Sequence, residues 1–378
     1  MYIFAVILFS ALAYFEVFDK EILNRYKAVL ILLCFSFLVF HDGFRWETGS
    51  DWKVYLEFFQ GLTVNYGIDK SPFEMGYTLF MYLIRLLTDD YTVYLIFHAL
   101  VFYSCFFYCI IKISNYPFVS ILVFYSIILP YLGMNRQFLA MGLYAVGLVF
   151  LLQNKRLPFV GMIVLGFLFH HTAILGLIAL LCNKKLKSIH IIVLLLIALV
   201  ISYSGTINKI ALSLVGLNSL GDNSQTGEKL DAYTTEAAYT SLSIVSTLIS
   251  LFKKILWISL VLAFKNKIDN KDSKFYILFN LYLAGTFLYL IFNGSLFQVL
   301  VSRALLYFNI TEMFIIPYVL TIFKQNYGKL IIMIILSLYC GINIQKGFRN
   351  YDTNNQKSDF FEPYKGIFIN TNYKRNSI

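Results

Sequence analysis

Residues 91–111 read YTVYLIFHALVFYSCFFYCII, a long stretch without a single Asp, Glu, Lys or Arg. A transmembrane α-helix needs about 20 mainly apolar residues to cross the hydrocarbon layer of a bilayer. Alternation of period two, the sign of an outer-membrane β-strand, is not sustained in this run or in the other apolar runs of the chain. The stretch therefore predicts a helix that spans a membrane.

The same kind of apolar run recurs along most of the chain. The other runs that qualify or nearly qualify as spans are 2–18, 26–41, 75–87, 116–132, 137–152, 157–182, 189–204, 242–264, 275–297, 303–323 and 329–345. Hydrophobic side chains make up 59% of the sequence and charged ones 14%, whereas soluble domains carry about 25% charged residues. The predicted fold class is an all-α, polytopic membrane helix bundle with about 10–12 transmembrane helices.

The formal net charge of +10 does not indicate nucleic-acid binding, because Lys and Arg are spread in small groups between the apolar runs. That distribution is typical of cytoplasmic loops beside lipid headgroups, so membrane lipids and no nucleic acid are the expected partners. The five cysteines lie in or at the edges of apolar runs and are interpreted as small buried hydrophobes. They show no metal-binding or redox spacing, and no cofactor is expected.

The sequence predicts a single transmembrane helical domain over residues 1–345 and a polar C-terminal tail over 346–378. Two long polar stretches, 42–74 and 205–240, contain more Asp and Glu than Lys and Arg. The short loops 183–188 and 265–274 are instead rich in Lys, so by the positive-inside rule they are cytoplasmic and the two acidic stretches are external. The first run lacks a basic start and a small-residue cleavage site, and we interpret it as a permanent span.

The number of spans depends on two runs. If all the runs cross, Lys155 and Arg156 lie outside, against the positive-inside rule, and Arg136 lies inside. In the alternative, the short run 75–87 dips into the membrane and returns, and 157–182 is a hairpin broken near its two histidines. Ten spans then remain, the Lys-Arg pair moves inside and Arg136 moves outside.

Charged residues also occur within two later runs. Run 242–264 carries Lys253 and Lys254 at its centre, and apolar and hydroxyl side chains share its first half at helical spacing. We interpret that half as an amphipathic helix in the membrane interface; the alternative places both lysines at mid-membrane, where they need an anionic partner. Glu312, inside run 303–323, is either paired within the bundle or part of a site.

The densest polar constellation is RWETGSDW at 45–52, followed by a tyrosine at 55 and by EMGY at 74–77. Trp and Tyr rings stack on the C–H faces of sugars, and carboxylates accept hydrogen bonds from sugar hydroxyls. The alternative is an aromatic belt with solvated charges at the membrane edge. The candidate substrate-binding residues of this region are Arg45, Glu47, Trp52, Tyr55, Glu74 and Tyr77.

Two arginines and two histidines occupy further unusual positions. Arg136 immediately precedes run 137–152 and Arg303 opens run 303–323. Such an arginine either snorkels to the interface or, being planar and always charged, binds phosphate oxygens bidentately. His170 and His171 lie in mid-run, where an ionisable group is a functional candidate; the alternative is a pair hydrogen-bonded between helices. No third ligand is evident, so no metal site is predicted.

Five short motifs occur in order along the chain. They are Arg45…Gly49-Ser50-Asp51-Trp52…Tyr55, Glu74-x-Gly76-Tyr77, Arg136-Gln137-x-x-Ala140, Phe169-His170-x-Thr172 and Arg303…Tyr307-Phe308. Together they resemble the EpsG family of polysaccharide polymerases, relatives of Wzy-type O-antigen and capsule polymerases. The resemblance covers residues 40–310. The usual Gly-Thr-Asp-Trp is Gly-Ser-Asp-Trp here, which keeps the hydroxyl, and Pro363-Tyr364-Lys365 in the tail matches only loosely.

The resemblance implies a multi-pass glycosyltransferase of the bacterial inner membrane. Such an enzyme joins oligosaccharide repeat units, carried on undecaprenyl diphosphate as both donor and acceptor, into O-antigen, capsule or exopolysaccharide. A chain-length regulator protein is a further expected partner, and neither a metal nor a nucleotide sugar is implied.

The resemblance also suggests roles for individual residues. Arg136 and Arg303, with Arg45 as a further candidate, would stabilise the departing diphosphate. His170 or Asp51 would accept the proton of the acceptor hydroxyl. The candidate substrate-binding residues then also include His171 and Tyr307.

Two other functional classes remain as alternatives. A flippase for the same lipid-linked sugars would also use intramembrane charges, but it should show internal repeats, and none is found in the sequence. A ligase or O-acyltransferase of envelope assembly would suit a membrane-embedded histidine.

Overall fold

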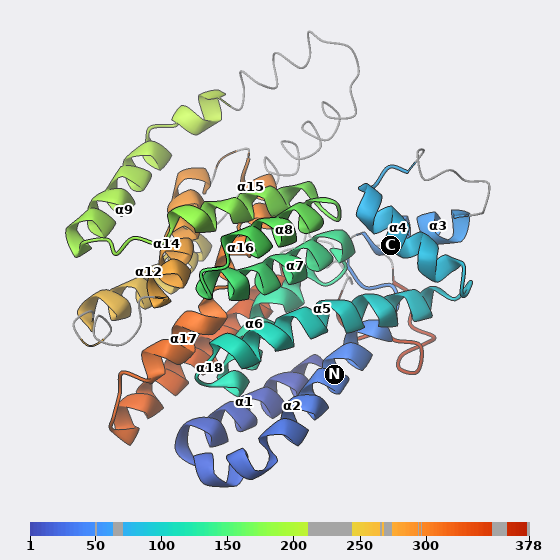
Figure 1. Cartoon of the computed structure of the whole chain (residues 1–378), viewed down its shortest axis with the longest axis horizontal. Helices are drawn as coiled ribbons and strands as arrows, with labels where there is room; N and C mark the ends of the chain where they lie inside the picture. The colour runs from blue at the N-terminus through green and yellow to red at the C-terminus, as the bar shows by residue number, and fades with distance from the viewer. Residues whose placement is uncertain are drawn as a thin grey trace. The chain divides into compact units, whose positions relative to one another are not determined.

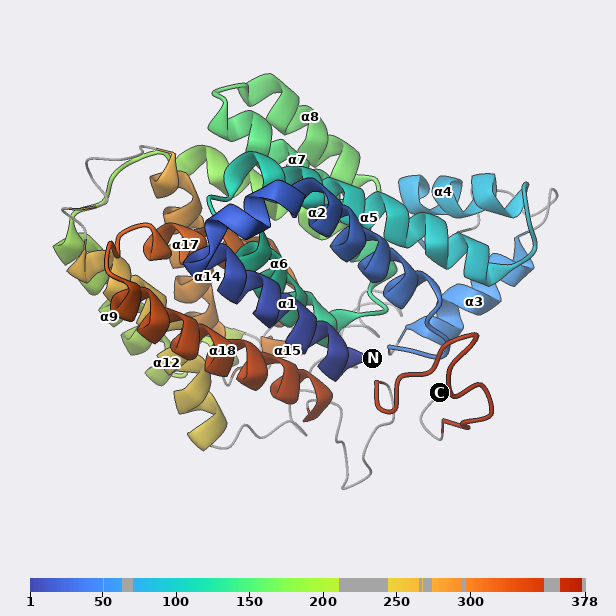
Figure 2. The same ribbon diagram turned by 90° about the horizontal axis from the view of Figure 1, so that it is seen from below.

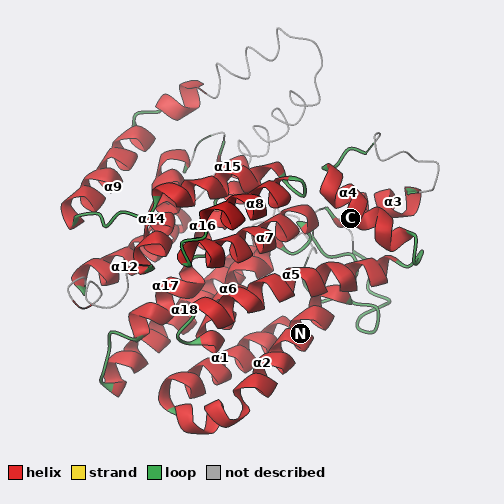
Figure 3. Ribbon diagram, viewed as in Figure 1, coloured by secondary structure: helices red, strands yellow, loops and turns green. Residues whose placement is uncertain are grey.

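The computed structural model describes residues 1–49, 51–62, 71–210, 244–264, 267, 274–293, 295, 297–349 and 361–375. Across these residues the regular structure is helical, and β-pairing occurs only as isolated bridges (Figure 3). The predicted all-α class is confirmed. Most of the predicted external loop at 205–240 lies outside the described residues.

The helices follow the apolar runs of the sequence (Figure 1). They are α1 (Tyr2–Phe18), α2 (Lys20–Gly43), α3 (Trp52–Gly61), α4 (Met75–Arg85), α5 (Tyr91–Ile113), α6 (Pro117–Ile128), η2 (Leu129–Tyr131), α7 (Asn135–Leu152), α8 (Arg156–Phe167), η3 (His171–Leu181), α9 (Ser188–Tyr203), α12 (Ile244–Ala263), α14 (Phe275–Phe292), α15 (Gln298–Ala304), α16 (Leu306–Asn309), α17 (Glu312–Leu320) and α18 (Asn326–Arg349).

Six helical segments among the described residues are long and apolar enough to cross a membrane. They are Leu23–Gly43, Tyr91–Ile113, Asn135–Leu152, Phe275–Phe292, Val301–Leu320 and Asn326–Gln345. Five shorter apolar helices accompany them: Tyr2–Phe18, Pro117–Tyr131, Arg156–Phe167, His171–Leu181 and Ser188–Tyr203. The protein is therefore a multi-pass membrane protein, and the total of ten to twelve crossings stays a prediction from the sequence.

The chain divides into two compact units, one formed by Met1–Leu180 with Ile316–Ile378 and the other by Leu181–Ile315. In the first unit α7 packs along α8 and α5, α5 packs along α2, and α1 packs along α6. Helix α18 returns to this unit and packs against α6 and η2. Figure 2 shows α1 and α2 side by side, with the N-terminus at one end of α1.

Two features of the first unit depart from a simple series of full spans. Helix α4 has 11 residues and is about 16 Å long, roughly half the thickness of the hydrocarbon layer. Run 157–182 is broken, because α8 ends at Phe167 and the 3₁₀ helix η3 begins at His171. The predicted break near the two histidines is present. Helix α3, within the predicted loop 42–74, was not expected from the sequence.

The C-terminal segment 361–375 folds back onto the end of α2. Gly366 forms an antiparallel bridge with Arg45. The backbone N–H of Trp46 donates to the Lys365 carbonyl at 2.9 Å, and that of Ile367 donates to the Phe44 carbonyl at 3.0 Å. This part of the predicted polar tail is therefore paired with residues of the motif region at 45–52.

In the second unit α14 packs against α9, α12, α15 and α16. Lys254 of α12 donates a hydrogen bond from Nζ to Asn309 Oδ1 at 2.8 Å, and Glu312 is buried in the same unit. The Lys254 side chain therefore contacts another helix of the second unit, which fits the alternative with an inward-facing lysine better than an interfacial one. The side chains of 244–250, on which the interfacial interpretation depended, are outside the described residues.

Candidate functional site

Two glycines bring the 45–52 loop against the start of α7. Gly49 has φ +91° and Gly133 has φ +105°, a region of backbone conformation that side-chain-bearing residues rarely adopt. A Cβ built on Gly49 would lie 2.9 Å from the Cα of Gly133, so the two turns touch backbone to backbone. The glycine of the Gly-Ser-Asp-Trp motif is thus required for the close approach of segments far apart in the sequence.

Arg45 joins the end of α2 to the beginning of α7. Its side chain is 1% exposed, and its guanidinium pairs with the buried carboxylate of Asp42 and donates from Nη2 to Asn135 Oδ1 at 2.6 Å. The backbone carbonyl of Asn135 lies 2.9 Å from His98 Nε2 on α5. Arg45 therefore binds protein groups in this structure, and its predicted contact with a substrate stays a prediction.

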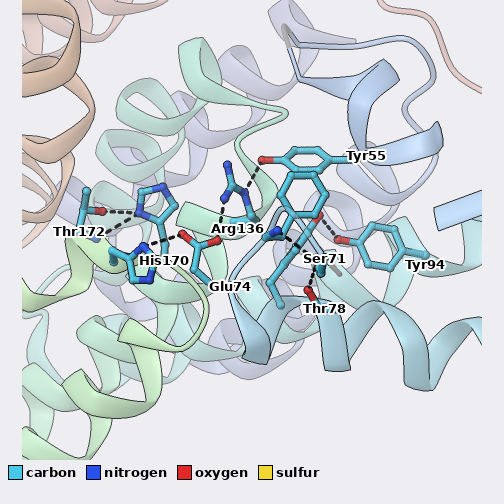
Figure 4. Close-up of polar contacts among 11 residues, drawn as sticks. Tyr55, Ser71, Glu74, Thr78, Tyr94, Arg136, His170 and Thr172 are labelled. Atoms are coloured by element: carbon cyan, nitrogen blue, oxygen red, sulfur yellow. Dashed lines mark hydrogen bonds and ion pairs between the residues drawn. The ribbon is translucent and has the colours of Figure 1, made fainter. Parts of the chain in front are cut away.

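Arg136 and Glu74 lie at the centre of the polar cluster in Figure 4. His171 lies against the same carboxylate. Arg136, the second residue of α7, donates from Nη1 to Glu74 Oε2 at 2.7 Å and from Nε to the Tyr55 hydroxyl at 3.2 Å. His171 Nδ1, at the start of η3, lies 3.5 Å from the other oxygen of Glu74. Three of the sequence motifs thus meet through one carboxylate.

A backbone hydrogen bond fixes the start of α4 against the turn that follows α8. Gly76 donates its N–H to the Leu168 carbonyl at 2.8 Å, and a Cβ on Gly76 would lie 2.8 Å from that same oxygen. The start of α4 therefore rests directly on the turn between α8 and η3. Within that turn, His170 Nδ1 lies 2.6 Å from the Thr172 hydroxyl and accepts the Thr172 N–H at 3.3 Å (Figure 4).

The charges of this cluster favour an ionised Glu74. Burial would raise the pKa of its carboxyl, but the positive charge and hydrogen bond of Arg136 outweigh that effect and hold the pKa below its ordinary value of 4.5. Glu74 is consequently a carboxylate at neutral pH. The arginine also lies 4.7 Å from the centroid of the Phe73 ring, so its guanidinium plane is fixed by contacts on several sides.

The order and spacing of these segments agree with a known family. A model of the EpsG family matches residues 28–365, most of the chain. The chain belongs to the EpsG family. Comparison with curated proteins and with solved structures finds no match. As an EpsG protein, the chain is a membrane protein linked to exopolysaccharide synthesis.

In this EpsG protein the predicted sugar-stacking rings are largely covered. Trp52 is 4% exposed, Tyr55 2% and Tyr77 0%. Trp52 packs edge-on against Trp46, with ring centroids 4.8 Å apart, and the Tyr77 hydroxyl accepts a hydrogen bond from Tyr94 at 2.7 Å. These rings form the packed support beneath the polar cluster, and their stacking on sugar stays a prediction.

The remaining sequence candidates occupy two different places. Asp51 is the half-buried residue immediately before α3, and Glu47 pairs with Lys365 of the C-terminal segment. Arg303 lies in α15 and Tyr307 in α16, both within the second unit. The structure thus brings Tyr55, Arg136, Glu74 and His171 together at the start of α7, whereas the joint action of Arg136 and Arg303 stays a prediction.

Several residues of the EpsG site were not singled out from the sequence. Asp42 and Asn135 flank the buried arginine, Ser71 and Thr78 share a hydrogen bond of 2.6 Å beside Tyr77, and Phe73 packs on Arg136. Asp42 had a usable signal, since an acid three residues before an arginine is at a spacing that allows the two to pair. In the described part of the chain, no three His, Cys, Asp or Glu side chains gather where they could hold a metal ion.

Proposed function

We propose that this EpsG protein is a polysaccharide polymerase of the bacterial inner membrane. It joins oligosaccharide repeat units carried on undecaprenyl diphosphate, which serve as donor and acceptor. The observation that carries the proposal is the fixed guanidinium of Arg136 at the beginning of α7. Its Nη2 atom donates no hydrogen bond to another described residue, and 25% of the side chain is exposed.

This arrangement suits a diphosphate leaving group. The first turn of an α-helix presents unpaired backbone N–H groups and the positive end of the helix dipole, which both favour an anion. An arginine at that position adds a permanent charge and a planar pair of donors. Because Glu74 and Tyr55 already hold two of its nitrogens, the guanidinium needs little reorganisation when negative charge develops on the departing oxygen.

The reaction also needs a second cation and a base. Arg303 of α15 is proposed as the second phosphate ligand, as its motif suggests. The sequence candidates for the base are His170 and Asp51. The apolar helices around the cluster supply the surface that a polyprenyl chain requires.

The test uses a strain that lacks its own copy of the gene and is complemented with variants of this chain. Arg136→Ala and Arg303→Ala should abolish long polymer while protein level in the membrane stays normal. Arg136→Lys should not restore polymer if bidentate phosphate binding matters, because Lys offers a single ammonium. Arg156→Ala, which removes an exposed arginine at the other end of the α7–α8 pair, is the matched control and should leave the polymer ladder unchanged.

The product pattern separates the polymerase from the other classes. Loss of long chains with single repeat units retained on the acceptor supports polymerisation. Loss of all external polymer with lipid-linked units accumulating inside the cell would point to a flippase. Normal polymer that is no longer attached or acylated would point to a ligase or O-acyltransferase.

A further inference from the structure

The two adjacent histidines have opposite hydrogen-bonding environments. His170 Nδ1 accepts the backbone N–H of Thr172 at 3.3 Å, so in the neutral ring the hydrogen resides on Nε2. His171 Nδ1 instead faces an oxygen of Glu74 at 3.5 Å. An ionised carboxylate only accepts hydrogen bonds, so this contact favours hydrogen on Nδ1 and leaves the lone pair of His171 on Nε2.

Glu74 and His171 also differ in how far their side chains are exposed. The Glu74 side chain is 7% exposed, whereas that of His171 is 69% exposed. The carboxylate is therefore held inside the protein by Arg136, and the imidazole beside it is largely exposed. A buried carboxylate behind an accessible imidazole is the arrangement that fixes a basic nitrogen toward a substrate.

We infer that His171, oriented by Glu74, is the general base that accepts the proton of the acceptor sugar hydroxyl. This inference rests on the proposed polymerase function and assigns the base within it. It also assigns different parts to the neighbours: His171 is a catalytic residue, Glu74 is a positioning residue, and His170 is a hydrogen-bond donor through Nε2.

The group-transfer step balances without any other reactant. The acceptor hydroxyl oxygen attacks the anomeric carbon of the sugar at the reducing end of the growing chain, and its proton passes to Nε2 of His171. The bond between the anomeric carbon and the phosphate oxygen breaks, and its electron pair leaves with undecaprenyl diphosphate. Arg136 stabilises the departing oxygens, and the carboxylate of Glu74 stabilises the imidazolium.

Several charged or titratable groups lie near His171. They are Glu74 at the start of α4, Arg136 at the start of α7, with Tyr55 of α3 bonded to it, and His170 in the preceding position. A proton on His171 removes the lone pair that accepts the substrate proton. The polymerisation rate should therefore fall on the acid side with the uptake of one proton.

The test measures polymerisation by the purified full-length protein in vesicles containing synthetic undecaprenyl-diphosphate-linked repeat units. His171→Gln should lower kcat by about 10²–10⁴-fold, leave KM nearly unchanged and remove the acid limb of the pH profile. His170→Gln should keep that limb. Glu74→Gln should lower kcat with KM nearly unchanged, because the carboxylate that orients the imidazole is lost.

Two controls test that each variant folds and that the effect is specific to His171. Each variant must elute and melt like the wild type in detergent, and His190→Gln, at an exposed position of α9, should leave kcat and the pH profile unchanged. Polymer from the wild type with an unaltered kcat and acid limb in His171→Gln would overturn this inference alone. A correctly folded wild type that makes no polymer would overturn the proposed function and this inference with it.

Discussion

At the residue scale, the Asp42–Arg45 pair is the most enclosed charge pair among the described residues, with side chains 0% and 1% exposed. Removing one member of a buried pair leaves an uncompensated charge, which costs about 3–5 kcal/mol. Asp42→Ala should therefore lower the free energy of unfolding by that amount, measured by thermal and denaturant melts in detergent. The protein level in membranes should fall in parallel.

The matched control for this prediction removes both charges. Asp42→Leu combined with Arg45→Met replaces the pair by apolar groups of similar volume, which is often close to neutral for stability. We expect the double variant to be more stable than Asp42→Ala alone. A double variant as unstable as the single one would mean that Asn135, which also binds Arg45, carries most of the effect.

The site residues differ in how far the sequence could identify them. The motif residues Glu74, Arg136 and His170 were found because charged or ionisable groups at the edge or in the middle of an apolar run are unusual. The resemblance made His170 a candidate base and His171 a candidate substrate-binding residue, but the residue pattern alone could not separate the two, because their distinction depends on which group faces each Nδ1. Nδ1 of His170 faces Thr172, two residues further along the chain, whereas Nδ1 of His171 faces Glu74 at the start of α4.

At the element scale, the apolar runs predicted the helices well but not the connections between them. Hydropathy reports which residues avoid water, so it located the helix breaks only where a polar pair interrupts a run, as at His171. Helix α3 escaped notice because its apolar face, with Trp52, Tyr55 and Phe59 buried, is short and lies in a polar stretch. The docking of 361–375 onto α2 depends on backbone pairing, which leaves no periodic signal in the sequence.

The C-terminal segment should stabilise the loop that carries the Gly-Ser-Asp-Trp motif. Lys365 is 7% exposed and pairs with Glu47, which is 28% exposed. Lys365→Met leaves the carboxylate partly desolvated without its partner and should cost about 1–3 kcal/mol of unfolding free energy. Thermal unfolding in detergent measures the loss.

A charge exchange tests whether the Glu47–Lys365 ion pair itself provides the stability that Lys365→Met removes. Glu47→Lys with Lys365→Glu should recover part of the stability that either single change removes. Lys374→Met, at an exposed position of the same segment, should leave the melting temperature unchanged. Equal losses in Lys365→Met and Lys374→Met would show that the segment contributes only through its backbone contacts.

At the scale of the whole molecule, the contacts of the first unit bear on how many times the chain crosses the membrane. Glu74 binds Arg136, and Arg45 binds Asn135, so the 42–74 stretch and the start of α7 lie at the same end of the helices. If every apolar run crossed, an odd number of spans would separate these two segments and place them on opposite faces. The short α4 and the broken 157–182 run instead agree with ten spans.

The ten-span arrangement predicts the sides of two accessible positions. Helix α7 has 18 residues and is about 27 Å long, so Lys155 lies on the opposite face from Arg136. Asp89, whose side chain is 88% exposed, follows the returning α4 and shares the face of Glu74. The positive-inside rule makes the Lys155 face cytoplasmic and the acidic 42–74 face external.

Labelling of single cysteines in a background without the five native ones decides between the two arrangements. With a membrane-impermeant maleimide on intact cells, Asp89→Cys should react, and Lys155→Cys should react only after the cells are permeabilised. Twelve crossings would reverse both results, so each position checks the other. Because the Glu74–Arg136 pair lies on the Asp89 face, the ten-span pattern would also place the proposed phosphate site on the external side, where lipid-linked repeat units are polymerised under the proposed function.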